Sequence, residues 1–168
     1  INLIPRFYDC HKGDIKIVLH QVPSGILTKN CQCVLGNGMV IDPVELVEEL
    51  GMLKENGIHY NGSIHIAENA HIVTPCHKMR DMLNESGSDN KIGTTLKGIG
   101  PTYMDKTGRN GLRIGDLEMN DWKEKYRNLA DKHESMISHY GVDIQYNLKG
   151  LEKEFFEAIK VLKKLPFI

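Results

Sequence analysis

The sequence between residues 92 and 117 reads Ile92-Gly-Thr-Thr-Leu-Lys-Gly-Ile-Gly-Pro-Thr-Tyr-Met-Asp-Lys-Thr-Gly-Arg-Asn-Gly-Leu-Arg-Ile-Gly-Asp-Leu117. It contains six glycines and four threonines, and it follows neither the 3.6-residue period of a helix nor the alternation of a strand. Connections this long are usually functional or disordered. Because aliphatic and aromatic residues are spaced along its length, we expect an ordered loop over residues 92–117.

The chemistry of this loop suits an anion. From Lys91 to Arg113 there are five basic residues and one acidic residue, an excess of four positive charges. Glycines let backbone N–H groups approach a ligand closely, and successive N–H groups form anion-binding nests. Thr95 offers a hydroxyl group, and Arg109 offers a planar guanidinium that matches phosphate. The alternative on composition alone is a surface loop whose charges are merely solvated.

The standard nucleotide-binding motifs do not fit this stretch. The spacing from Gly93 to Gly98 is that of a P-loop, but Ile99 stands where the lysine belongs. The dinucleotide fingerprint also fails, because Tyr103 stands where its third glycine belongs. A phosphate site here therefore needs another precedent.

The segment Gly98-Ile-Gly-Pro-Thr-Tyr-Met-Asp-Lys-Thr-Gly-Arg109 resembles the signature of adenylosuccinate synthetases, GIGPxYxxKxxR. The pattern fixes many positions within a short stretch, so chance agreement is improbable. The resemblance runs from about residue 17 to the C-terminus and includes residues 22–26, 36–43, 92–95 and 111–117.

The resemblance implies a specific activity. Adenylosuccinate synthetases ligate IMP and L-aspartate with GTP hydrolysis and Mg²⁺, as homodimers with one α/β domain. In such an enzyme Thr95 would contact the IMP phosphate, Arg109 would reach the IMP of the other subunit, and Lys106 is a possible helper. Many members have Gly-Arg where this chain has Leu96-Lys97, so the resemblance gives Lys97 no role.

Two catalytic strings of the family do not occur in this sequence. The family's catalytic aspartate lies in a Gly-Asp-Glu-Gly-Lys-Gly loop that also binds GTP phosphates and Mg²⁺, and its catalytic histidine lies in Gly-His-Asn-Ala-Gly-His. The isolated pair Gly13-Asp14 is no substitute, and residues 1–16 match the family poorly. The guanine-reading and aspartate-binding segments are missing too. We therefore expect an internal fragment with no catalytic residue and no metal ligand of its own, inactive alone, that carries part of the IMP site and dimer surface.

The composition fits a globular domain. The 168 residues suit one domain, and they are 40% apolar and 26% charged. A net charge of −1 gives no field for nucleic acid, and no stretch is long and apolar enough for a membrane partner. Without a recognisable export signal, the four cysteines indicate reduced thiols in a cytoplasmic protein.

Sequence patterns predict strands and helices before the loop. A strand is expected over residues 15–20, and apolar runs at 32–35 and 39–41 flank Gly36-Asn37-Gly38, a hairpin signal. The alternative for these glycines is a close backbone approach to a ligand. Asp42 and Pro43 open a helix with Glu45 completing a capping box, and this helix stops at Gly57. A strand at 63–67 and a helix from Thr74-Pro75 to Gly87 follow.

Helices dominate after the loop. One is expected from Asn120 to Gly141 and another over residues 151–165, each with an apolar stripe. The predicted fold is a single α/β domain over residues 1–168 with a partial central sheet and flanking helices. Residues 1–91 form its α/β part, 92–117 the glycine-rich phosphate loop, and 118–168 a mainly helical part.

Other groupings of reactive residues favour ordinary structural roles. Cys31-x-Cys33 lacks zinc spacing, and neighbours such as Cys76 and His77 point apart on regular elements. His133 is interpreted as a packed histidine on an apolar helix face, and no partner marks Cys76 as a nucleophile. The glutamates of the first helix are expected on its solvated side: Glu45, Glu48 and Glu49.

Two other functions remain open on the sequence. The chain would be a stand-alone nucleotide-phosphate binding module if the loop binds without catalysis. It would be an interaction protein if residues 92–117 bind a partner instead.

Overall fold

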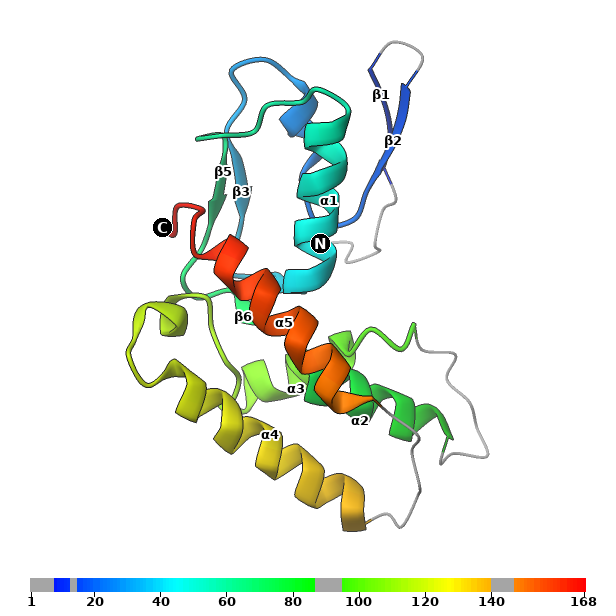
Figure 1. The fold of residues 1–168 in the computed structure, drawn as a ribbon, viewed down its shortest axis with the longest axis vertical. Helices are drawn as coiled ribbons and strands as arrows, with labels where there is room; N and C mark the ends of the chain where they lie inside the picture. Colours follow the sequence, from blue (N-terminus) through cyan, green and yellow to red (C-terminus); the bar gives the residue numbers. More distant parts are fainter. Residues whose placement is uncertain (1–7, 13–14, 87–94, 140–146) are drawn as a thin grey trace.

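The structure is a computed structural model that describes residues 8–12, 15–86, 95–139 and 147–168 (Figure 1). Helix α1 and strands β1, β2, β3 and β5 lie at one end, helices α2, α3 and α4 lie at the other, and α5 runs between them (Figure 1). No helix in the described part of the chain is long and apolar enough to cross a membrane. The helices are α1 Pro43–Glu55, α2 Pro75–Ser86, α3 Ile99–Thr107, α4 Trp122–His139 and α5 Leu148–Leu162, with 3-10 turns η1 Ser24–Leu27 and η2 Gly115–Glu118.

The strands form short, separate ladders. Strand β3 (Cys33–Leu35) pairs in parallel with β5 (Ile64–Ile66), and β4 (Val40–Ile41) pairs in parallel with β6 (His71–Ile72). Strands β1 (Tyr8–Lys12) and β2 (Ile15–Leu19) form an antiparallel pair. Bridges from Ile66 to Phe167 and from His71 to Arg113 extend the two parallel ladders. The predicted α/β fold with a partial sheet is confirmed.

The hairpin expected at Gly36-Asn37-Gly38 is wrong. Strands β3 and β4 flank these residues but pair with β5 and β6, not with each other. The amide of Met39 donates to the carbonyl of Gly36 at 3.0 Å, so the segment is a turn that redirects the chain. Burial of the two strands against parallel partners therefore outweighs the local turn signal.

Helix α1 forms as its sequence predicts. The Asp42 side chain accepts from the amides of Val44 and Glu45, and Pro43 occupies the first turn. At the other end Gly57 adopts a φ of +67°, and the Ile58 amide bonds the Leu53 carbonyl. This is the left-handed glycine stop. The apolar stripe is buried as expected: Leu46, Leu50 and Leu53.

Two expectations about the glutamates of α1 are wrong. Glu45 does not complete a capping box, because the Asp42 amide donates to Gln21 Oε1 and Glu45 pairs with Lys97. Glu49 is only 5% exposed and not on the solvated side. Its carboxylate accepts from the amides of residues 20–22, which surround it.

The expected loop over residues 92–117 is wrong where α3 forms, and residues 92–94 lie outside the described part. Gly98 precedes α3 with a φ of +74°, and the Thr102 hydroxyl donates to its carbonyl at 2.7 Å. The buried face consists of Pro101, Thr102 and Asp105. A helix that buries a polar face shows no apolar period, so the sequence pattern could not reveal it.

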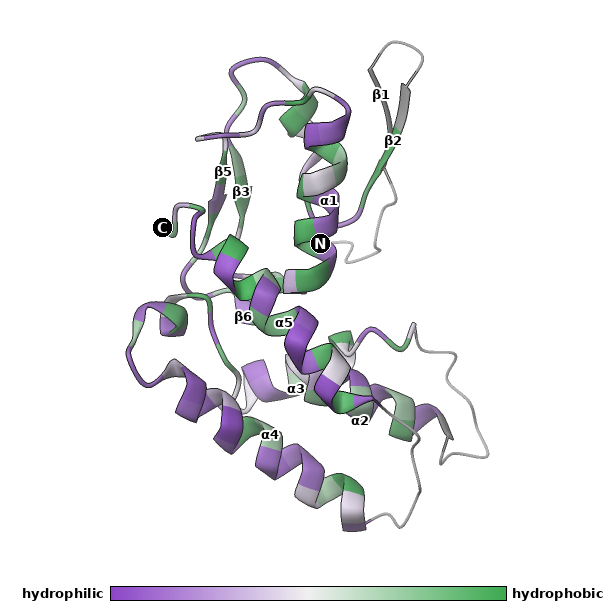
Figure 2. Ribbon diagram, in the orientation of Figure 1, coloured by the Kyte–Doolittle hydropathy of each residue, from purple (hydrophilic) through white to green (hydrophobic). Residues whose placement is uncertain are grey.

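The two C-terminal helices supply much of the core. Most of α4 is hydrophilic (Figure 2), and it buries Tyr126, Leu129, Ala130, His133 and Ile137. It begins at Trp122, two residues after the predicted cap Asn120, and Gly141 lies outside the described residues. Tyr126 stacks on Phe155 of α5 with ring centroids 5.3 Å apart. The mainly helical C-terminal part is confirmed.

Candidate functional site

Helix α3, which lies within the signature segment and is called the signature helix, is hydrogen-bonded to the glycine turn at residues 36–39. The Tyr103 hydroxyl donates to the Gly38 carbonyl at 2.9 Å. The Lys106 ammonium donates to the carbonyls of Asn37 and Met39, the latter at 3.3 Å. Burial lowers the pKa of Lys106. The ammonium group of Lys106 is thus occupied by backbone carbonyls. The helix and the turn that this contact joins both belong to segments that resemble the family.

Arg109 lies in a tight turn just after α3. Its φ is +59°, a left-handed conformation that is uncommon outside glycine. The amides of Asn110 and Gly111 both donate to the Asp105 carbonyl, at 2.9 and 3.3 Å. The Arg109 side chain is exposed, and within the described residues no carboxylate pairs with it. Its guanidinium is free to meet an anion from outside.

Thr95 lies before the other end of α3 and is exposed. The chain after it is held at several points: Leu96 has a φ of +56°, Lys97 pairs with Glu45 at 2.7 Å, and the Gly98 amide donates to Asp81 Oδ2. Lys97, to which the sequence gave no role, therefore anchors this strained segment to α1.

Thr95 and Arg109 flank α3 on opposite sides in the chain. The nine residues of α3 lie between them, a helix length of about 13 Å at 1.5 Å per residue.

A polar hub joins three helices. It is made of the buried residues His77, Asp105 and His133 and the partly exposed Lys132. Asp105 Oδ2 lies 3.0 Å from Nε2 of His77 and 2.6 Å from Nε2 of His133, and Lys132 approaches Oδ1 at 3.3 Å. The Thr74 amide donates to Nδ1 of His77, so that ring carries its proton on Nε2 and donates it to Asp105. The hub ties α2, α3 and α4 together.

The hub shifts the pKa values of its members. Burial alone would raise the pKa of Asp105, but hydrogen bonds from His77 and His133 outweigh it and hold this pKa well below its usual value. Burial lowers the pKa of both histidines, and their bonds to Asp105 oppose this only in part. The stable arrangement is one carboxylate with two neutral imidazoles.

The expectation that Cys76 and His77 point apart is wrong. Ligand atoms of Cys76, His77 and His133 lie within 4.8 Å of one another, because the first turn of α2 wraps both neighbours around Thr74. Burial raises the pKa of the Cys76 thiol to about 12, which disfavours the thiolate that a metal or a nucleophile needs. His77 already uses both nitrogens in hydrogen bonds.

The sequence reasoning missed the hub. His133 is fully buried, as a packed histidine would be, but its ring also bonds the carboxylate of Asp105. A signal was present, because a histidine in an apolar stripe needs a buried partner. Asp105, the acidic residue of the signature helix, was the available one.

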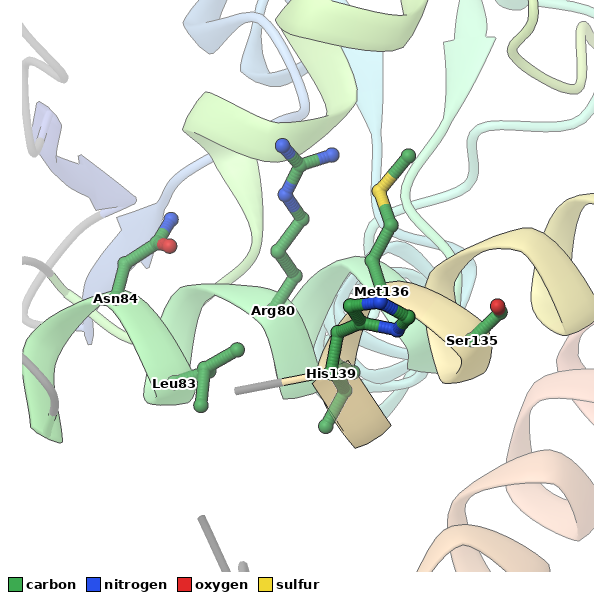
Figure 3. A pocket seen from close by; sticks show the side chains of 7 residues that line it. Arg80, Leu83, Asn84, Ser135, Met136 and His139 are labelled. Carbon is green, nitrogen blue, oxygen red and sulfur yellow. The ribbon is translucent and has the colours of Figure 1, made fainter. Parts of the chain in front are cut away.

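The described part of the structure has two open cavities of similar volume. One, of about 430 Å³ between α2 and α4, is lined by Arg80, Leu83, Asn84, Ser135, Met136, Ile137 and His139 (Figure 3). The other, of about 470 Å³ beside α1, includes Glu45 and Lys97 in its wall. Thr95, Lys106 and Arg109 line neither cavity. The candidate site is an exposed surface at the ends of α3.

Comparisons with known proteins agree on one family. The family model for adenylosuccinate synthetase matches residues 9–167. The chain is 56% identical to adenylosuccinate synthetase of Flavobacterium johnsoniae, in a match that covers 92% of this chain. It is 45% identical to adenylosuccinate synthetase of Chlorobaculum tepidum, in a match that covers 87% of this chain. It spans 37% and 34% of these relatives. This coverage agrees with the expectation of a fragment.

A solved structure supports the same assignment. The structure of fully ligated adenylosuccinate synthetase from Plasmodium falciparum superposes with a TM-score of 0.72 at 30% identity, covering 90% of this chain and 35% of that one. The signature segment, the fold and the family match coincide in one chain. The chain therefore belongs to the adenylosuccinate synthetase family.

Proposed function

We propose that this chain is part of an enzyme that ligates IMP and L-aspartate to adenylosuccinate in AMP biosynthesis, at the expense of GTP. The observation that carries the proposal is the signature helix α3, with an exposed threonine before one end and, after the other, an exposed arginine that pairs with no carboxylate among the described residues. We propose the IMP phosphate as the ligand of these two residues, and the family match supports this choice.

The positions of the two ligands on either side of α3 fit a homodimer. A helix about 13 Å long lies between Thr95 and Arg109, and we propose that each meets the complementary residue of a second copy. A threonine hydroxyl and a bidentate guanidinium suit a phosphate dianion. We assign Thr95 to the IMP phosphate of its own subunit and Arg109 to that of the other subunit.

The described residues offer no fit for Mg²⁺ or for the GTP phosphates. The Gly-Asp-Glu-Gly-Lys-Gly string is absent from the sequence. The most buried carboxylates are already satisfied by amides, imidazoles or ammonium groups: Asp42, Glu49, Asp81, Asp105 and Asp116. We therefore derive no catalytic step from this chain, and we propose that GTP and Mg²⁺ bind residues outside it.

The free thiols support a proposal about the cellular setting. Cys31, Cys33 and Cys76 are free cysteines, and free thiols persist in a reducing compartment. We propose a cytoplasmic enzyme without nucleic acid or membrane partners.

A calorimetric titration with IMP tests the proposal. The chain should bind IMP as a dimer and bind inosine more weakly, because inosine lacks the phosphate. Arg109→Ala should weaken IMP binding about tenfold or more, the value of a charge-assisted contact. Sedimentation of the same samples gives the oligomeric state.

Three outcomes would contradict parts of the proposal. Turnover of IMP, GTP and aspartate by this chain would refute its lack of catalytic residues. Equal binding of IMP and inosine by a dimer would refute the phosphate site. A dimer with no nucleotide response would favour a partner-binding loop.

A further inference from the structure

The conformation of Arg109 needs support from outside its own residue. A left-handed backbone is unfavourable for a side chain with a Cβ, and such residues persist only where the surroundings hold them. Arg109 is exposed, so packing of its side chain does not supply that support. The support must come from the main chain on either side.

The main chain of Asp105 holds this turn. Its carbonyl accepts from the amides of Asn110 and Gly111, the two residues after Arg109. Gly111 is also confined, because a Cβ there would lie 2.6 Å from Cδ2 of His71. The turn can therefore keep its shape only while the Asp105 carbonyl stays in place.

The side chain of Asp105 fixes that carbonyl. It is 3% exposed and is held from two other helices, by His77 of α2 and by Lys132 and His133 of α4. Three donors from two directions leave the end of α3 little freedom to shift or unwind. Asp105 thus bonds the Arg109 turn with its main chain and the protein core with its side chain.

We propose that Asp105 is a positioning residue that presents Arg109 to the phosphate of the partner subunit's nucleotide. The proposal rests on the proposed function, in which Arg109 binds that phosphate. Asp105 itself is buried and does not touch the nucleotide.

The first test measures the order of the turn without any ligand. Asp105→Ala should speed amide hydrogen exchange at Asn110 and Gly111 about tenfold, while amides in α5 keep their protection. Asp116→Ala is the matched control, since Asp116 is also a buried aspartate with two cationic partners, Arg113 and Lys125. It should leave exchange at Asn110 and Gly111 unchanged.

A milder variant serves if Asp105→Ala does not fold. His133→Leu removes one donor to Asp105, and it also removes Nδ1, a buried atom without a hydrogen-bond partner in the described part of the chain. It should speed exchange at Asn110 and Gly111 about threefold. Unchanged exchange at both amides in whichever variant folds overturns the proposal.

The second test separates positioning from general stability. Asp105→Ala should lower the ratio of IMP to inosine affinity about tenfold, and the double variant with Arg109→Ala should be no weaker than Arg109→Ala alone. Asp105→Asn should restore most of the ratio, because its amide oxygen can accept from both imidazoles and the partly exposed Lys132 can turn its ammonium from the NH₂ group to solvent. A role in folding alone would weaken IMP and inosine equally.

The outcomes distinguish this inference from the proposed function. If Arg109→Ala leaves the affinity ratio unchanged, the phosphate role of Arg109 fails and the exchange rates alone decide whether Asp105 holds the turn. If Arg109→Ala lowers the ratio but Asp105→Ala does not, the positioning role is overturned. An equal loss in Asp105→Ala and Asp116→Ala overturns it too.

Discussion

Glu49 lies with its Oε2 atom 2.9 Å from the backbone nitrogen of Val22. Its other oxygen accepts from the amides of His20 and Gln21, both at 2.9 Å. Three successive N–H groups thus surround one carboxylate from helix α1, as a backbone nest surrounds a bound anion. The protein fills this nest with its own side chain and so fixes the segment between β2 and η1.

Glu49→Gln should destabilise the fold by about 2 kcal/mol, the value of hydrogen bonds to a buried charged acceptor. The glutamine amide would turn donor hydrogens toward donor N–H groups. Urea unfolding measures the change. Glu48→Gln is the control, because Glu48 is the exposed neighbour on the same helix and should change stability by less than about 0.5 kcal/mol. Equal effects would contradict the nest.

Stability should fall in acid through the buried histidines. Burial lowers the pKa of His71, His77 and His133 in the folded protein. Near pH 6.5 the unfolded chain therefore binds more protons than the folded chain. The stability they contribute is present above about pH 6.5 and is lost as the pH falls, by up to about 1.4 kcal/mol per pH unit for each.

The carboxylate of the hub acts in the same direction at lower pH. The pKa of Asp105 is lowered in the fold, so its contribution to stability is present above its unfolded pKa near 3.9 and is lost as the pH falls further.

Urea unfolding at pH 7.5, 6.5 and 5.5 tests the prediction for the histidines. His133→Leu should reduce the slope, and a flat profile would contradict the prediction.

Lys106→Met should destabilise the protein by about 1 kcal/mol, because the carbonyls of Asn37 and Met39 lose their donor. Thermal unfolding measures the loss. Lys160→Met is the control, since Lys160 is exposed and bonds only to exposed Glu157 in the described structure. If both variants unfold alike, the contact between α3 and the glycine turn contributes nothing.

Arg109→Gly should stabilise the fold while it removes phosphate affinity. Glycine adopts a φ of +59° without the penalty of a Cβ, which is worth about 1 kcal/mol. Arg127→Gly, on an exposed face of α4, should have the opposite sign and cost about 1 kcal/mol. Denaturant unfolding of the two variants compares them directly, and a destabilised Arg109→Gly would show that the turn is unstrained.

The sequence could predict the elements whose signals are local. Asp42, Pro43 and Gly57 mark the ends of α1, and the apolar stripe between them lies in the core. The α/β class and the mainly helical C-terminal part follow from the same kind of signal. Each of these features depends on residues within one element.

The rest depends on contacts between distant segments. Helix α3 escaped prediction because its buried face carries Thr102 and Asp105 where an apolar stripe would be expected, and Asp105 finds its partners on other helices. The hairpin predicted at Gly36-Asn37-Gly38 does not form, because the strands on either side of it pair in parallel with strands farther along the chain. Glu49 was assigned to the surface because nothing near it in sequence shows that the amides of residues 20–22 fold back onto it.

The separation of Thr95 and Arg109 along α3 has a genetic consequence if each nucleotide site takes one residue from each chain. A subunit with a defective Thr95 still lends a sound arginine, and a subunit with a defective Arg109 still keeps a sound threonine. Mixing the two defective chains would restore one intact site in every mixed dimer. Two alleles that are each inactive alone would then complement one another.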